Sequence, residues 1–211
     1  MTKEIEVKSK YVLPSTGYYE FSANGVPKYR LLEKMTPSMT QDELAELYEV
    51  EKKKGNPLPL NSIQMFEIME DAVKSGDKNL MNHIQKGLQM WPNTLSRVIY
   101  NPKGEDEVIH WYGTSDEEKM KGHLVGKDGF IKNINNPNAL EFLLGTSDIK
   151  RINGVTNSIN KTPMYFWRFN SKPNERTERV VGFDAGGGRL YLDADRCLSG
   201  EIPAFLVEFL K

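Results

Sequence analysis

The sequence has few of the residues that form covalent or metal cross-links. Among its 211 residues, Cys197 is the single cysteine, and the three histidines are widely scattered. One cysteine excludes an intrachain disulfide, and scattered histidines do not give the paired spacing of a zinc site. A chain without disulfides is typical of a reducing compartment, so we expect a cytoplasmic protein without structural zinc.

Long apolar runs and a strong net charge are also absent. The longest uninterrupted apolar stretches, at 164–167 and 204–207, are four residues long, whereas a membrane-spanning helix needs about 20. The polar N-terminus lacks the apolar segment of a signal peptide, so we expect neither secretion nor a membrane partner. A formal net charge of −1 argues against a strongly basic nucleic-acid-binding protein.

Enough apolar residues remain to form a folded core. They make up 38% of the chain, aromatic residues make up 10%, and both are spread over the whole length. This composition argues against disorder, and a chain of this length buries most of its apolar surface on folding. We therefore expect a single folded domain over 1–211.

The segment from 40 to 91 has three sets of helix signals. Thr40 and Glu43 match a capping box, and Gly55 suits the end of that first helix. A second helix is predicted to begin at 61–62 and to end at 75–76. Asp77 is the predicted cap of a third helix, which ends before Pro92. These three short helices form a helical subdomain or an insertion at 40–91 in our interpretation.

Strand patterns lie on both sides of this helical segment. The Asn24-Gly25 pair between two strand-like runs predicts a hairpin over 18–32, and Pro27 indicates an edge strand. The later strands are predicted at 95–100, 107–112, 164–169, 179–183, 189–193 and 205–209. Short helices are predicted at 115–121 and 137–144. Helices grouped between strands favour an α+β fold whose mostly antiparallel sheet comes from N- and C-terminal strands.

The register of one hairpin can be predicted from its pattern. If 185–188 is a four-residue loop, Asp184 lies opposite Arg189, and Tyr191 lies over the bare backbone of Gly182. One face of the hairpin is then wholly apolar, with Val181, Phe183, Leu190 and Leu192. A slip of one residue would mix the two faces, so the separation supports this pairing.

Asp193 and Asp195 continue the polar face of the hairpin and are candidate ligands of Mg²⁺ or Mn²⁺. Residues two apart on a strand point the same way, about 6.6 Å apart, and carboxylates bind hard cations. In such a metal-dependent hydrolase or transferase, His110 or His123 would carry the proton. Alternatively, the two aspartates are ordinary residues of a strand end, and His110 is a structural residue within a strand.

The densest aromatic run, at 164–169, has two interpretations. A strand that is apolar on both faces is typical of a central strand covered on both sides. Alternatively, Trp167 and Arg168 form a binding surface together with Arg189 and Tyr191 of the 179–196 hairpin. Aromatic rings with arginines bind single-stranded nucleic acid by stacking on its bases.

We recognise no catalytic motif in the sequence, and we therefore predict a non-catalytic binding or interaction protein. The near-neutral charge favours a protein partner or a small ligand over nucleic acid. The first alternative is the metal-dependent hydrolase or transferase that uses the Asp-x-Asp pair. The second alternative is a single-stranded nucleic-acid binder. No cofactor is evident apart from Mg²⁺ or Mn²⁺ at the aspartates.

Overall fold

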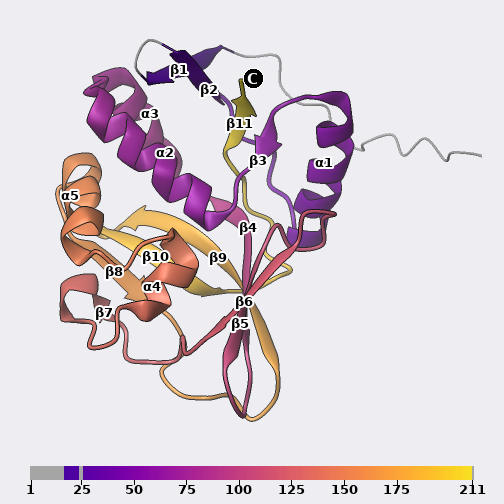
Figure 1. Cartoon of the computed structure of the whole chain (residues 1–211), viewed down its shortest axis with the longest axis vertical. Coiled ribbons are helices and arrows are strands. Elements are labelled where there is room, and N and C mark those ends of the chain that lie inside the picture. The colour runs from indigo at the N-terminus through magenta and orange to yellow at the C-terminus, as the bar shows by residue number, and fades with distance from the viewer. Residues whose placement is uncertain (1–16, 24–25, 211) are drawn as a thin grey trace, which may run out of the picture.

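A computed structural model of the chain describes residues 17–23 and 26–210. Over these residues the chain forms five α-helices and eleven β-strands, which confirms the α+β fold (Figure 1). The helices are α1 (Gln41–Lys54), α2 (Ser62–Ser75), α3 (Lys78–Leu88), α4 (Asn138–Leu144) and α5 (Ile149–Asn160). A 3₁₀ turn, η1, spans Ile131–Asn133. The N-terminal residues that bear on a signal peptide, and the Asn24-Gly25 turn, lie outside the described residues.

The strands form two sheets. The strands are β1 (Tyr18–Ala23), β2 (Val26–Leu32), β3 (Leu58–Pro59), β4 (Asn93–Tyr100), β5 (Asp106–His110), β6 (Glu118–Gly122), β7 (Gly129–Phe130), β8 (Met164–Trp167), β9 (Thr177–Gly186), β10 (Arg189–Arg196) and β11 (Leu206–Phe209). One sheet has the order β1-β2-β11-β3, and the other has the order β6-β5-β4-β9-β10-β8-β7. Of the described strand pairs, β8 with β10 is parallel and the others are antiparallel.

Helices on two sides bury the apolar faces of these sheets. The main core brings α2, α3, α4 and α5 together with inward-facing residues of the seven-stranded sheet and of β2. A smaller core joins α1 to Leu95 of β4 and to Leu206 of β11. Figure 1 accordingly shows α1 on one side of the four-stranded sheet and α2 with α3 on the other. How the chain divides into domains stays a prediction.

Local capping signals placed the first three helices correctly. The Thr40 hydroxyl oxygen accepts the Glu43 backbone N–H at 3.3 Å, and Glu43 accepts the Thr40 N–H in return. Asn61 and Asp77 cap α2 and α3 with their side-chain oxygens. Gly55 ends α1 with a φ of +71°, a left-handed conformation that glycine adopts without a Cβ clash.

Three expectations about elements were wrong. The segment predicted as a helix at 115–121 contains β6, whose residues pair with β5 along 106–110. Helix α5, capped by Asp148, was not predicted at all. Strand β2 is not an edge strand, since it pairs with both β1 and β11. Pro27 fits because β11 pairs with β2 only at 29–31, so the missing N–H at 27 removes no bond of that ladder.

The β9–β10 hairpin keeps the predicted faces but not the predicted register. Its loop is Gly187-Gly188, with φ values of +56° and +73°, so Arg189 lies opposite Gly186 and Tyr191 lies opposite Asp184. Two positive φ values identify a two-residue type I′ turn, which suits the twist of paired strands. The shift equals two residues, so every side chain stays on its predicted face. The expected Asp184–Arg189 cross-strand pair does not form.

Candidate functional site

Arginines hold both aspartates of the predicted metal pair. Asp193 and Asp195 share the outer face of β10, as expected from their spacing. The Arg196 Nε–H donates to Asp193 at 3.1 Å, and the Arg179 Nε–H donates to Asp195 at 2.9 Å. Within the described parts of the chain, no group of three or more His, Cys, Asp or Glu residues could hold a metal ion. A cation would have to displace these arginines, and the metal hypothesis stays a prediction.

The two candidate proton carriers lie in different surroundings. His110 is fully buried; its Nδ1 is 2.7 Å from the Ser96 hydroxyl, and its Nε2 is 2.9 Å from the Phe142 carbonyl oxygen. Burial lowers the pKa of His110, which favours the neutral ring within this network. His123 is exposed in the stretch after β6. In the described part of the chain, neither ring makes a hydrogen bond with Asp193 or Asp195.

The predicted aromatic surface is partly open. The Trp167 side chain is 45% exposed, so β8 is not a strand covered on both sides as expected. Arg189 lies 4.8 Å from the ring centre of Tyr165, and Tyr191 packs edge-on against that same ring. Arg168 does not belong to this group, because it directly follows β8 and lies on the buried face.

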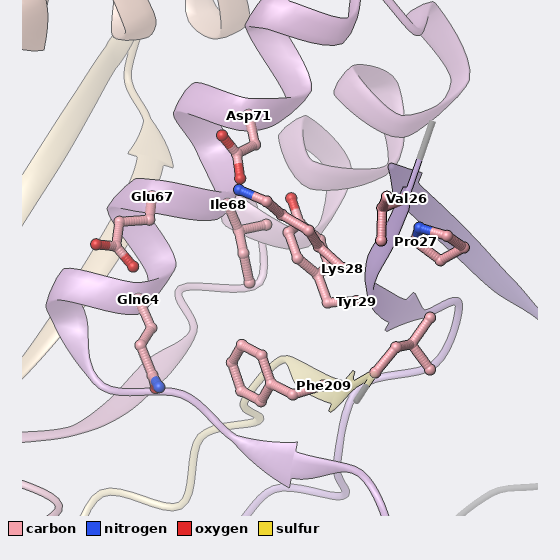
Figure 2. Close-up of a pocket in the computed structure, with 10 residues that line it drawn as sticks. Val26, Pro27, Lys28, Tyr29, Gln64, Glu67, Ile68, Asp71 and Phe209 are labelled. Carbon is pink, nitrogen blue, oxygen red and sulfur yellow. The ribbon is translucent and has the colours of Figure 1, made fainter. Parts of the chain in front are cut away.

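A cleft that the sequence analysis missed lies between α2 and the ends of β2 and β11. Its volume is about 450 Å³, which is within the range of small-molecule sites. Gln64 and Glu67 of α2 lie on one side of the cleft, and Lys28 and Tyr29 of β2 lie on the other (Figure 2). The remaining lining is mainly apolar and consists of Val26, Pro27, Ile68, Phe209 and Leu210, together with Asp71.

A buried hydroxyl group without a partner lies in the wall of this cleft. Tyr29 is 4% exposed, and its ring stacks on Phe21 with 5.1 Å between ring centres. The Tyr29 oxygen makes no hydrogen bond to any described residue, and it lies on the α2 side of its ring (Figure 2). Burial, followed by the charges of Asp71 and Glu67, raises the pKa of this hydroxyl. A buried polar group left unpaired costs about 1–3 kcal/mol, which a bound ligand would recover.

Two carboxyl groups stand one helical turn apart beside this hydroxyl. Partial burial raises the pKa of Glu67, and the charge of Asp71 adds to the effect. Partial burial also raises the pKa of Asp71, while the nearby Lys28 charge opposes the increase. The Lys28 ammonium group points toward Asp71, although the two make no ion pair within 4.0 Å in the described structure (Figure 2). The cleft therefore has two incompletely paired acidic groups next to an apolar floor.

Only part of this cleft had a signal in the sequence. Gln64, Glu67, Ile68 and Asp71 follow the spacing of one helical face, so their common position on α2 could have been predicted. Nothing local indicates that Phe209 lies beside Tyr29, because β11 pairs with β2 across some 180 residues of chain. The cleft is thus a product of long-range strand pairing.

Comparisons with known proteins add no identity to this geometry. No protein-family model, no curated protein and no solved structure matches the chain. A function must therefore be argued from the chemistry of the cleft itself.

Between residues 17 and 210, leaving out 24–25, none of the helices has the length and apolar character needed to cross a bilayer.

Proposed function

We propose that this is a binding protein whose cleft takes a small organic cation, an ammonium group joined to a compact apolar group. The observation that carries the proposal is the unpartnered, buried Tyr29 hydroxyl beside Glu67 and Asp71. An ammonium group has three donors and no acceptor, so it complements two carboxylates and a phenolic oxygen. The partner in this proposal is a small ligand, and no cofactor is needed.

The apolar part of the ligand would lie against the floor of the cleft. Ile68 is buried beneath the cleft, and Phe209 is half exposed at its lower edge (Figure 2). An exposed phenyl ring next to a concave surface gains free energy when a ligand covers it, about 25 cal/mol per Å² of apolar area. An apolar group joined to the ammonium therefore adds affinity that a bare ion lacks.

The Lys28 ammonium group competes with the cationic ligand for the cleft carboxylates. Its charge opposes the rise in the pKa values of Asp71 and Glu67 that burial causes. A bound cation must displace Lys28 or share the carboxylates with it, so Lys28 weakens the binding of cations.

Calorimetric titration with 2-phenylethylammonium, and with neutral 2-phenylethanol as a matched control, tests this function. We expect saturable binding of the cation and much weaker binding of the alcohol. Tyr29→Phe removes the unpaired oxygen and is expected to lower the affinity for the cation by about three- to tenfold, the value of one hydrogen bond. Lys28→Met is expected to raise the affinity for the cation. Equal affinity for the cation and the alcohol would contradict the proposal.

A cytoplasmic location belongs to the same proposal. The Cys197 thiol is free and exposed, which suits a reducing compartment.

A further inference from the structure

A second cavity, here called the Arg168 cavity, lies in another part of the fold, around β7 and η1. Its volume is about 530 Å³, and it is lined by residues of the 125–136 segment around β7 and η1, together with Arg168 at the end of β8. None of its lining residues belongs to the cleft between α2, β2 and β11. Any ligand of this cavity is therefore independent of the organic cation.

The cavity contains a buried guanidinium group without a carboxylate partner. Arg168 is 8% exposed, and no ion pair joins it to an acidic residue in the described part of the chain. Its Nη1 donates to the Leu124 carbonyl oxygen at 3.0 Å, and its Nη2 donates weakly to the Lys127 carbonyl oxygen at 3.5 Å. The Nε–H has no hydrogen-bond partner. A buried charge without a counter-charge is costly, so this arrangement favours an anion.

The nearest acidic group is already engaged elsewhere. Asp128 accepts the backbone N–H of Arg168 at 2.8 Å and the side-chain amide of Asn170 at 3.3 Å. The charge of Asp128 acts on Arg168 without a direct bond to the guanidinium, while burial lowers the pKa of Arg168. The carboxylate thus stabilises the loop without bonding to the guanidinium group, and the buried Nε–H is left without a partner.

The other lining groups add hydrogen-bond donors. Asn133, Asn135 and Asn136 line the cavity, and the charged residues Lys127 and Asp128 line it as well. Gly126 provides room for the guanidinium group, because a Cβ atom at this position would lie 2.3 Å from the Arg168 Nη2. A glycine here is therefore a requirement for the buried arginine.

We propose that the Arg168 cavity binds a small oxyanion, a carboxylate or phosphate group, through the Arg168 Nε–H and the asparagine amides of the 133–136 segment. A guanidinium group offers parallel N–H donors that match two oxygens of either group. The bound anion would supply the counter-charge that the described chain does not.

The Arg168 Nε–H resonance in ¹H–¹⁵N spectra reports on this contact directly. The resonance is assigned by its disappearance in Arg168→Lys. Separate titrations with inorganic phosphate, succinate and chloride at matched ionic strength are expected to move it saturably with phosphate, succinate or both, and not with chloride. The stronger of the two oxyanions identifies the preferred group. An unmoved resonance, or an equal response to chloride, would overturn the proposal.

Variants that leave Arg168 in place keep the test decisive if Arg168→Lys does not fold. Gly126→Ala displaces the guanidinium group and is expected to weaken oxyanion binding by about tenfold or more, the value of a hydrogen bond to a charged group. Asn135→Ala, at an exposed position, is expected to weaken it by a few-fold. Lys103→Ala, in the distant β4–β5 turn, is the control and is expected to have no effect. Equal weakening by Lys103→Ala and Asn135→Ala would show a non-specific charge effect and contradict the proposed site.

Discussion

Replacing Arg196 with leucine is expected to lower the free energy of unfolding by about 3–5 kcal/mol, the range for removing one partner of a buried charged network. Its buried guanidinium group donates to the carbonyl oxygens of Trp91, Pro92 and Phe183 and to the side chains of Asn93 and Asp193. These bonds join the end of β10 to β9 and to the start of β4. Leucine would leave the acceptors buried without donors. Urea unfolding followed by circular dichroism measures the change.

Arg30→Leu is the matched control for this prediction. Arg30 makes two ion pairs, with Glu20 at 3.0 Å and Glu208 at 3.4 Å, but its side chain is 32% exposed. Solvent screens such pairs, so the control is expected to cost far less stability than Arg196→Leu. If the two variants lowered the free energy of unfolding equally, the buried hydrogen bonds of Arg196 would not be what holds β4, β9 and β10 together.

The double variant Glu67→Gln/Asp71→Asn is expected to lose binding of the organic cation by about 100-fold or more, because two charge-assisted hydrogen bonds disappear. Without ligand, the same variant is expected to be more stable than the parent at neutral pH. Burial raises the pKa values of both carboxyl groups, and the charge of Asp71 adds to the rise at Glu67, so their charged forms destabilise the folded state. A binding site that costs stability is a common trade-off in proteins.

The sign of the pH dependence follows from these raised pKa values. Between the ordinary carboxyl pKa of about 4 and the higher folded values, the folded chain binds more protons than the unfolded chain. The contribution of Glu67 and Asp71 to the free energy of unfolding therefore falls as the pH rises through this window. The advantage of the double variant should be present at pH 7 and absent below about pH 4.

A control pair on another helix separates this effect from a general change of charge. Asp42 and Glu46 stand one turn apart on α1 and are both exposed, and Asp42 also lies 3.7 Å from the Arg97 Nη2. Asp42→Asn/Glu46→Gln changes the net charge equally and is expected to leave cation binding unchanged and to give no stabilisation. If both double variants stabilised the fold by similar amounts, the claim that the charged forms of Glu67 and Asp71 destabilise it would be wrong. Thermal unfolding at several pH values measures both.

Local signals predicted the helices well because capping is local chemistry. Thr40, Asn61 and Asp77 each satisfy backbone N–H groups within three residues, so the start of each helix could be predicted from its own sequence. Ser115 and Glu118 also have the spacing of a capping box, which favours the helix predicted at 115–121, but Glu118 begins strand β6. There, pairing of β6 with β5 outweighs the local preference.

Contacts between segments far apart in the chain could not be predicted from the sequence. The faces of the β9–β10 hairpin could be predicted from alternation, but its register depended on which glycines made the turn. Arg168 was assigned to an aromatic surface, although its position directly after β8 places it with Met164 and Phe166 on the buried face. The cleft at Tyr29 depends on β11 joining β2, and no pattern within either strand predicts that pairing.

The measurement that most directly tests the central claim is a search for intermolecular nuclear Overhauser effects to bound 2-phenylethylammonium. We expect the phenyl protons to show contacts with the Ile68 methyl groups and the Phe209 ring, the apolar floor of the cleft. These contacts should weaken in Glu67→Gln/Asp71→Asn at the same ligand concentration. Contacts only to residues outside the cleft, such as Ile134 of the Arg168 cavity, or no contacts at saturating ligand would contradict the account.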